Sequence, residues 1–449
     1  MTRTPSRDSM STQQQRIAEL ARQAPELGFT TLAHHLDQTW LLTAYQDTRK
    51  GGATGIDGQG GADYAVNLEQ NLRELENRAK SGTYRAPPLR RTWIPKGTGK
   101  ELRPLGIPTF EDKVLQRAVV QLLEPIYEQD FLDCSYGYRP RRSAHQALQT
   151  VWRHTMDLGG GWILEVDIRK FFETLDHAQL REMLRQRVRD GVVLRLIDKW
   201  LAAGVLEDGA LTTPDAGTPQ GGVISPLLAN IYLHYVLDVW FEREVKPRLL
   251  GKAFLVRFAD DFVLIFQHEA DAQRVQEVLP KRLARYGLSL NEAKTRLVSF
   301  VRPTDSTGTQ PGKPESQPGT FDLLGFTHYW GKSRRGTWVV KRKTASNRFA
   351  RALGKVAAWC RKHYHRPVAE QSRALGQKLR GHFSYFGITG NASALCGFRE
   401  GVRRLWYKWL GRRQRHGYFS WSAYSALLQR YPLPPAKVVH SVYRLAANP

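Results

Sequence analysis

Two adjacent aspartates, Asp260 and Asp261, lie between the apolar runs 254–258 and 262–266. Short β-prone runs on both sides of a polar turn predict a β-hairpin, and this one would carry the two acids at its tip. Carboxylates at an exposed turn are hard oxygen ligands of the kind that Mg²⁺ binds. A pair of aspartates in a turn is more often a simple solvated loop, so the neighbouring segments have to decide between the two interpretations.

Asp167 is the candidate for a third carboxylate. It follows the apolar run 162–166, which predicts a second strand that ends in an acid. Asp167 and Asp260 are 93 residues apart in the chain, so only a fold that aligns both strands in one sheet can bring them to a shared metal pair. In-line phosphoryl transfer uses such a pair, with one ion at the attacking oxygen and the other at the leaving oxygen.

A glycine-rich segment, residues 217–230, lies between the two acids in the sequence. Ser225 is a suitable N-cap, and Pro226 a suitable first residue, for a helix that begins there. The glycines fit an ordinary tight turn, but they would also let a nucleotide approach the backbone closely.

The order of these motifs resembles the fingers and palm of a reverse transcriptase, most closely the type that bacterial group II introns encode. Further segments resemble motifs of that family: residues 91–96, 103–109, 112–116 and 135–140 before Asp167, and residues 287–295 and 321–326 after Asp261. The resemblance implies an α+β fold with the right-hand architecture of a polymerase, in which fingers and palm are followed by an α-helical thumb/maturase domain.

The resemblance also implies three parts of the chain. They are an N-terminal helical extension over residues 1–50, fingers and palm over residues 51–330, and a basic helical thumb/maturase (X) region that binds RNA and DNA over residues 331–449.

Residues 302–320 are rich in turn-forming residues and are expected to form an inserted loop. Residues 1–25 lack an apolar period and are expected to fray, whereas residues 27–48 look helical.

By the same resemblance the acids acquire catalytic roles. Asp167 and Asp260 would be the principal ligands of two Mg²⁺ ions, and Asp261 would complete the catalytic cluster. The carbonyl group of Ile168 could add a neutral ligand. An idle site has no reason to keep three mutually repelling carboxylates, which argues against a relic polymerase.

Five residues fall where the family contacts the nucleotide. Phe172 would lie beneath the sugar and exclude a ribose 2′-hydroxyl, so the product would be DNA; a core aromatic at a strand-to-helix junction is the alternative. Lys96 and Arg103 would meet the triphosphate. Gln220 would lie near the incoming base, and Lys294 could assist the departing pyrophosphate. For the three cations, a solvated surface position is the alternative.

One position departs from the family pattern. The residue before Ala-Asp-Asp, usually a tyrosine, is Phe258 in this chain. The loss of one hydroxyl group leaves the predicted metal site intact. It puts in doubt any fine contact between this residue and the end of the primer.

The positive charge is concentrated near the C-terminus. The chain carries a formal net charge of +25, and residues 331–449 hold 25 Lys and Arg against two acids, so the rest of the chain is close to neutral. This region also has aromatic residues, and its helical periodicity predicts helices at residues 345–364, 374–386 and 395–410. It resembles the thumb/maturase region at residues 378–387 and 406–410. It is expected to fold and to bind RNA. The cations proposed to contact phosphate are Arg380, Arg412, Arg413 and Arg415. The aromatics could stack on bases, but packing inside a helical thumb is the stronger alternative for each.

Composition limits the class of protein. No apolar stretch approaches the ~20 residues of a membrane span, and the polar N-terminus lacks the apolar core of a secretory signal. Cys134, Cys360 and Cys396 are isolated, so neither disulfides nor a zinc site is expected, and a cytoplasmic location fits. The chain stops at Pro449 without a Cys-rich or His-Asn-His nuclease segment, so second-strand cutting by that route is not expected.

The sequence is therefore interpreted as an RNA-directed DNA polymerase. Its expected partners are an intron RNA template, a DNA primer or target, and deoxynucleotides, and the resemblance adds intron splicing and retrohoming. Two alternatives stay open: a domesticated enzyme of the same ancestry in host defence or repair, and an RNA-binding splicing cofactor whose polymerase part is a relic.

Overall fold

The protein divides into two compact units. The computed structural model describes residues 7–95, 102–207, 210–212, 217–218, 221–303, 319–413 and 419–441. The first unit comprises Met1–Ala144 and Val166–Arg296, and the second comprises His145–Glu165 and Leu297–Pro449. The boundary between them falls inside strands β3 (Trp162–Asp167) and β8 (Arg296–Ser299). The boundaries expected at residues 50 and 330 follow the order of motifs and remain predictions.

The first unit begins with helices packed around a long buried helix. They are α1 (Arg7–Gln23), α2 (Gln38–Asp47), α3 (Gly61–Ala65), α4 (Leu68–Ser81) and the central helix α5 (Phe110–Asp130). The expectation that residues 1–25 fray is wrong for α1, which packs on α5 and buries Ile17 and Ala21. Residues 27–48 are not one helix either. A short 3₁₀ turn (Ala33–His35) precedes α2. Asp37 is the N-cap of α2, and its carboxylate accepts a hydrogen bond from the backbone N–H of Trp40 at 2.8 Å.

A small sheet follows in the same unit. Strands β1 (Leu89–Pro95) and β2 (Leu102–Ile107) pair antiparallel, and the sheet has the order β2-β1-β4-β5, with β4 (Val205–Glu207) and β5 (Ala210–Thr212). Helices α7 (Phe171–Thr174), α8 (His177–Arg187) and α9 (Gly191–Leu201) lie between β3 and β4 in the chain. The register places Arg103 opposite Ile94.

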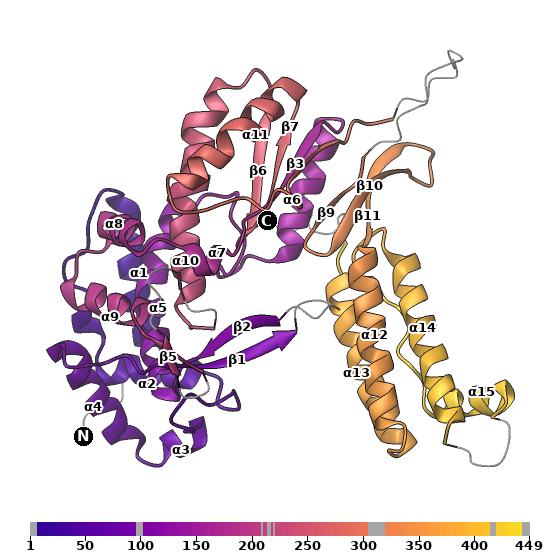
Figure 1. Ribbon diagram of the computed structural model, residues 1–449, viewed down its shortest axis with the longest axis horizontal. Coiled ribbons are helices and arrows are strands. Elements are labelled where there is room, and N and C mark those ends of the chain that lie inside the picture. The colour runs from indigo at the N-terminus through magenta and orange to yellow at the C-terminus, as the bar shows by residue number, and fades with distance from the viewer. Residues whose placement is uncertain are drawn as a thin grey trace. The chain divides into compact units, whose positions relative to one another are not determined.

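The predicted acidic hairpin is confirmed. Strands β6 (Ala253–Phe258) and β7 (Asp261–Phe266) pair antiparallel in a sheet of order β6-β7-β3-β8. Phe258 pairs with Asp261, so Ala259 and Asp260 form a two-residue turn. Helix α11 (Glu269–Ala284) packs against β7, and the two run side by side in Figure 1. Because the strand predicted at residues 162–166 is β3, one sheet carries both acidic strand ends, as the sequence argument required.

The helix after the glycine-rich segment starts differently from the prediction. Helix α10 spans Ser225–Leu233, and its N-cap residue is Ile224, which makes no side-chain cap. The Ser225 hydroxyl instead accepts a hydrogen bond from the Thr218 hydroxyl at 2.8 Å. This contact ties the glycine-rich segment to the helix. Two π-helical turns, His234–Asp238 and Trp240–Val245, continue α10.

The second unit joins a three-stranded sheet to a group of helices. Strands β9 (Phe321–Leu323), β10 (Phe326–Lys332) and β11 (Trp338–Thr344) form an antiparallel sheet of order β11-β10-β9. Helix α6 (Ala144–Asp157) is attached to it through a hydrogen bond from the Trp152 indole to the Val340 carbonyl at 3.0 Å. Helices α12 (Ser346–His363), α13 (Val368–Phe386) and α14 (Ala392–Gly411) confirm the three helical patterns predicted at residues 345–364, 374–386 and 395–410. Helix α15 (Trp421–Arg430) was not predicted.

The predicted α+β class is confirmed by this mixture of helices and sheets. None of the helices in the described part of the chain combines the length and the apolar character that a membrane span needs. All three cysteines are free thiols.

Candidate active site

The turn of the β6–β7 hairpin has an unusual backbone. Ala259 has a φ of 57°, in the left-handed region that a two-residue hairpin turn demands and that residues with a Cβ rarely adopt. Asp260 is half-buried in the turn, whereas Asp261 is exposed at the start of β7. The two adjacent carboxylates therefore occupy different environments on the same tip.

Asp167 ends β3 with its carboxylate held by two neighbours. Its Oδ2 atom accepts hydrogen bonds from the Asn291 amide at 2.9 Å and from Lys294 Nζ at 3.3 Å. The main chain of the same segment binds too, because the Asn291 backbone N–H donates to the Asp167 carbonyl at 2.8 Å. Lys294, which was predicted to act on pyrophosphate, thus lies beside the metal-ligand candidate Asp167.

Ile168 continues the pairing as the partner of Leu290 in an antiparallel bridge. The hydrogen bonds flank this pair, from Asn291 to Asp167 and from Arg169 to Ser289. In an antiparallel ladder, a pair flanked in this way turns its own N–H and C=O groups away from the partner segment. The Ile168 carbonyl is therefore directed away from Leu290, as a ligand in the catalytic cluster would require.

The two acidic strand ends interact electrostatically. Burial raises the pKa of Asp260 above its ordinary value, and the negative charge of Asp167 raises it further, while a backbone hydrogen bond and the charges of Arg103 and Arg257 oppose the rise. A divalent cation would relieve the repulsion between the carboxylates, so the donor set fits Mg²⁺. Among the described residues, however, no group of three or more His, Cys, Asp or Glu side chains converges on one metal position. Assignment of the ligands is accordingly a proposal.

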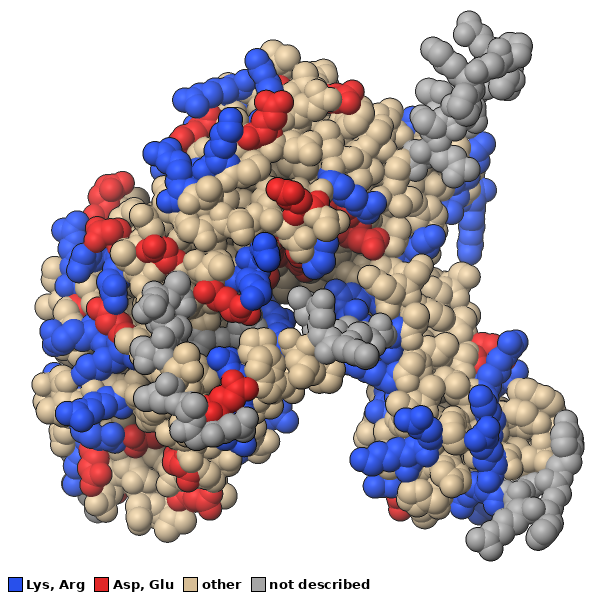
Figure 2. All heavy atoms as spheres, in the orientation of Figure 1, with Lys and Arg blue, Asp and Glu red and all other residues tan. Residues whose placement is uncertain are grey.

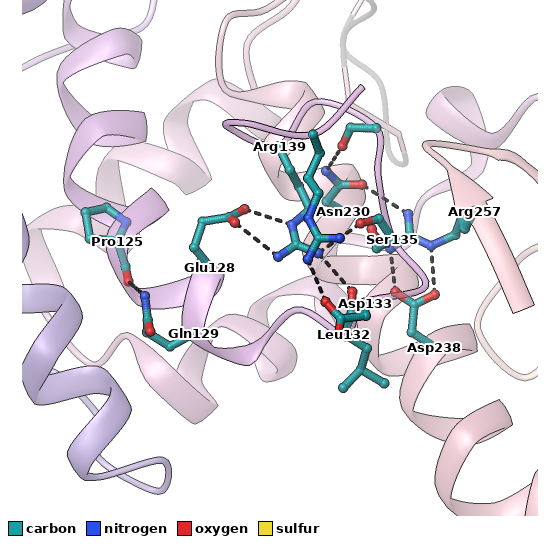
Figure 3. Close-up of polar contacts among 12 residues, drawn as sticks. Pro125, Glu128, Gln129, Leu132, Asp133, Ser135, Arg139, Asn230, Asp238 and Arg257 are labelled. Carbon is teal, nitrogen blue, oxygen red and sulfur yellow. Dashed lines mark hydrogen bonds and ion pairs between the residues drawn. The ribbon is translucent and has the colours of Figure 1, made fainter. Parts of the chain in front are cut away.

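A buried polar network behind the turn was not foreseen from the sequence (Figure 3). Arg257, which is fully buried, makes a two-pronged contact with the equally buried Asp238, at 2.7 and 2.5 Å. Its remaining donors reach the Asn230 side chain at 3.0 Å, the Ser135 hydroxyl at 2.8 Å and the Ala259 carbonyl at 3.1 Å. Burial favours a lower pKa for Arg257, but the Asp238 carboxylate outweighs it and the pKa lies above its ordinary value. The network fixes the left-handed residue of the acidic turn.

A second ion pair extends the network. Arg139 grips both carboxylate oxygens of Glu128 at 3.0 Å and donates to the backbone carbonyls of Leu132 and Ser135 at 2.8 and 2.9 Å. Ser135 therefore contacts both arginines, its carbonyl binding Arg139 and its hydroxyl Arg257, as Figure 3 shows.

The loop that carries these residues is pressed against the acidic turn. The Asn230 amide donates to the Gly137 carbonyl at 2.6 Å. A Cβ atom on Gly137 would lie 2.3 Å from the Ala259 nitrogen, so only glycine fits there. Gly137, Ser135, Asn230 and Arg257 all belong to segments that the sequence motifs include, but nothing in a single sequence pairs them with one another or with Asp238.

Buried polar contacts also position the glycine-rich segment. The Gln116 side chain accepts from the backbone N–H of Val223 at 2.7 Å and donates to Asp112 at 3.0 Å. Gly221, with a φ of 118°, approaches the carbonyl of Gly106 so closely that a Cβ would lie 2.4 Å from it. Thus α5 and β2 together hold the entry to α10.

Phe172 is tied to the start of this segment. Its side chain is 9% exposed, and its ring makes an edge contact with Phe171 at 5.3 Å. The Phe172 carbonyl accepts from the Thr218 backbone at 2.7 Å, and Gly217 adopts a φ of 92° in close contact with it. The first unit therefore brings Phe172 and the glycine-rich segment together.

The other predicted nucleotide contacts are only partly placed. Arg103 is exposed on β2, and its positive charge lowers the pKa of Asp260 against the effect of burial. Lys96 and Gln220 lie outside the described residues.

The predicted RNA-binding cations lie in the second unit. Arg380 is exposed on α13, and Arg412 and Arg413 are exposed just after α14. The Arg412 guanidinium lies over the Trp409 ring, 5.1 Å from its centroid. Figure 2 shows Lys and Arg side chains spread over these helices with few acidic neighbours on the face drawn. Arg415 lies outside the described residues.

The aromatic residues of the second unit mainly pack within it. Trp406 and Tyr424 are fully buried in a core with Leu375, Leu379 and Leu395, and Trp359, Tyr407 and Trp409 pack on its edge. The packing alternative is therefore confirmed for Trp406.

Comparison with known proteins identifies the class. The sequence profile of the family described as "Reverse transcriptase (RNA-dependent DNA polymerase)" matches residues 94–328, more than half of the chain. The chain belongs to this family and is an RNA-directed DNA polymerase. The family agrees with the α+β fold and with the acidic strand ends described above.

Particular relatives narrow the type. Protein YkfC of Escherichia coli (strain K12) is 36% identical over 327 residues, which cover 64% of this chain and 84% of YkfC. The group II intron-encoded protein LtrA of Lactococcus lactis subsp. cremoris is 44% identical over 188 residues, which cover 40% of this chain and 31% of LtrA. Nuclear intron maturase 2, mitochondrial, of Arabidopsis thaliana is 28% identical over 177 residues, which cover 30% of this chain and 24% of that protein. The predicted resemblance to group II intron reverse transcriptases is confirmed. The chain spans less than a third of the length of LtrA. The activities of the whole LtrA protein are therefore not assigned to this chain by the match alone.

Proposed function

We propose that this reverse transcriptase copies a group II intron RNA into DNA, and that its second unit binds the same RNA, assists its splicing and supports its insertion into DNA. The observation that carries the proposal is the pair of acidic strand ends in one sheet. Asp260 lies in a turn fixed from behind by Arg257, and its pKa responds to the charge of Asp167.

The acids of the first unit form the proposed metal site. Asp167, Asp260 and Asp261 would hold two Mg²⁺ ions, with the Ile168 carbonyl as a neutral ligand. Such a pair of ions activates the attacking oxygen and stabilises the leaving oxygen of a phosphoryl transfer. Asn291 and Lys294 orient the Asp167 carboxylate, since both bind its Oδ2 atom.

The residues around the acids would position the nucleotide. Arg103 and Lys96 would bind the triphosphate, and Lys294 would neutralise charge on the departing pyrophosphate. Phe172 would exclude ribonucleotides from below the sugar. Its carbonyl contact with Thr218 couples this gate to the glycine-rich segment, where Gln220 would meet the base.

The cations of the second unit would bind the RNA. Residues 331–449 carry 25 Lys and Arg against Glu370 and Glu400. Arg380, Arg412, Arg413 and Arg415 would contact phosphates, and each such contact makes binding weaken as salt rises. The relatives whose names are those of intron-encoded or maturase proteins support RNA as the partner of the chain.

A primer-extension assay on an RNA template tests the proposal. Asp260→Ala is expected to abolish DNA synthesis, because the variant loses a principal metal ligand, while its affinity for the RNA stays near that of the wild type. Asp198→Ala is the matched control, since it removes an aspartate that pairs with Arg181 on the surface of the same unit. If Asp260→Ala synthesises DNA as well as the wild type, the proposed metal site is wrong. If the wild-type protein synthesises no DNA in Mg²⁺, the alternative of a relic polymerase is favoured.

A further inference from the structure

We propose that Tyr138 contacts the last nucleotide of the primer and supplies there the hydroxyl group that Phe258 lacks. The inference rests on the proposed metal site, because that site determines where the 3′-hydroxyl of the primer must lie.

The backbone of Tyr138 is in a disfavoured conformation. Its φ is 57°, in the left-handed region that a bulky side chain seldom adopts. Such conformations persist only where the surroundings impose them, and they gather at functional sites. A second such residue lies nearby, because Ala259 in the acidic turn also has a φ of 57° and packs against Gly137, the residue before Tyr138.

The residue before Tyr138 is held against the acidic turn. The preceding residue, Gly137, lies against the Ala259 nitrogen, and its carbonyl is held by Asn230. Asn230 in turn accepts from Arg257, which also binds Ala259. The contacts that fix the hairpin therefore also fix the residue to which Tyr138 is bonded.

The Tyr138 side chain is open to solvent although it is held in this way. It is 60% exposed, with its ring centroid 6.4 Å from that of Phe258 at an interplanar angle of 42°. It also borders a cavity of about 330 Å³ that Val223, Pro226 and Leu227 help to line. Packing in a core therefore does not explain why a ring is present at this position, because much of its surface contacts no other protein atoms.

The acidic residues lie within electrostatic reach of the phenol. After burial, the charge of Asp260 is the largest effect that raises the pKa of Tyr138, and Asp261 adds to it, while Arg103 opposes them. The two rings thus form a small aromatic surface beside the carboxylates.

The chemistry of this surface suits the end of a primer. Aromatic faces pack against sugars and bases, and a phenol adds a hydroxyl group that can donate to a phosphate or sugar oxygen. Phe258 provides only the apolar part. In this chain the hydroxyl comes from the neighbouring loop at Tyr138.

Steady-state primer extension with Tyr138→Phe tests the role of the hydroxyl. The KM for the primed template is expected to rise about threefold to tenfold, as for the loss of one hydrogen bond, while the KM for the deoxynucleotide stays unchanged. Adding Phe258→Tyr to Tyr138→Phe is expected to restore the lost primer affinity, because the hydroxyl returns from the other ring.

A second variant separates this role from a structural one. Tyr138→Gly relaxes the left-handed backbone, so its thermal midpoint is expected to equal or exceed that of the wild type while its KM for the primed template rises. If both Tyr138 variants use primers as well as the wild type, or if only the nucleotide KM changes, the proposal is wrong. Failure of the metal site would show differently, as DNA synthesis that survives in Asp260→Ala.

Discussion

The arginines at the acidic hairpin and the arginines proposed to bind RNA lie in opposite environments. In the first unit, arginines at the acidic hairpin are buried and paired, with Arg257 bound to Asp238 and Arg139 bound to Glu128. In the second unit, Arg380, Arg412 and Arg413 are exposed. The sequence from residue 331 onward supplies two acids for 25 cations.

This difference separates charges that hold protein groups in one geometry from charges that attract a polyanion. A buried, fully hydrogen-bonded pair holds one geometry and is little affected by dissolved salt, whereas exposed cations attract a polyanion with a strength that depends on salt. The first unit thus uses buried charge to fix the turn that carries the proposed metal ligands. The second unit is proposed to use exposed charge to hold nucleic acid.

Breaking the buried pair should have the largest effect. Asp238→Asn leaves the Arg257 charge uncompensated, so the free energy of unfolding is expected to fall by roughly 3–5 kcal/mol and DNA synthesis to fall with it. Urea unfolding and primer extension measure the two effects.

A surface pair in the same unit provides the control for that experiment. Asp198→Ala removes a partly exposed partner of Arg181 and is expected to cost less than ~1 kcal/mol. Equal effects of Asp198→Ala and Asp238→Asn would show that the buried pair does not fix the hairpin.

Neutralising three arginines of the second unit should have an intermediate effect. Changing Arg412, Arg413 and Arg415 to Gln is expected to weaken RNA binding and to flatten the plot of log affinity against log salt by about 2, at ~0.7 per lost contact to single-stranded phosphate. Filter binding across a salt series measures the slope.

A matched triple variant in the first unit tests whether position or total charge matters. Arg22, Arg73 and Arg185 are all exposed on helices, and changing them to Gln removes the same charge. An equal loss of slope in this variant would contradict a distinct RNA-binding role for the second unit.

The smallest effect is expected at Glu400, the acid that the second unit pairs with Arg403 and Arg404. Hydrogen bonds from Arg403 are the main cause that lowers the pKa of Glu400 to about 2 from its ordinary 4.5. Because the folded pKa is the lower one, the pair stabilises the fold above pH 4.5, and this contribution disappears as pH falls toward 2. Glu400→Gln should cost less than ~1 kcal/mol at pH 7, since the group is partly exposed. Urea unfolding should show this difference shrinking with acid, and a constant difference would contradict the assignment.

The part of the site that follows from local pattern could be predicted. Short apolar runs around Asp260 and before Asp167 were enough to place both acids at strand ends, and the helical period was enough for α12, α13 and α14. These patterns span a few residues each, so a single sequence contains them completely.

The support behind the site depends on contacts between distant residues. Arg257 meets Ser135 across 122 residues and Asp238 across 19, and no local pattern encodes either pairing. The same limit explains the error at the N-terminus, because α1 is polar over most of its length and becomes ordered by burying Ile17 and Ala21 on α5. The error at Ser225 has the same origin, because the Thr218 hydroxyl binds the Ser225 hydroxyl that was predicted to cap the helix.

The most direct test of the central claim is to count bound Mn²⁺, as a substitute for Mg²⁺, by electron paramagnetic resonance with a primed RNA template and a deoxynucleotide present. We expect two ions per wild-type chain, fewer in Asp260→Ala and an unchanged count in Asp198→Ala. An unchanged count in Asp260→Ala would contradict the claim that the acidic strand ends hold the metals.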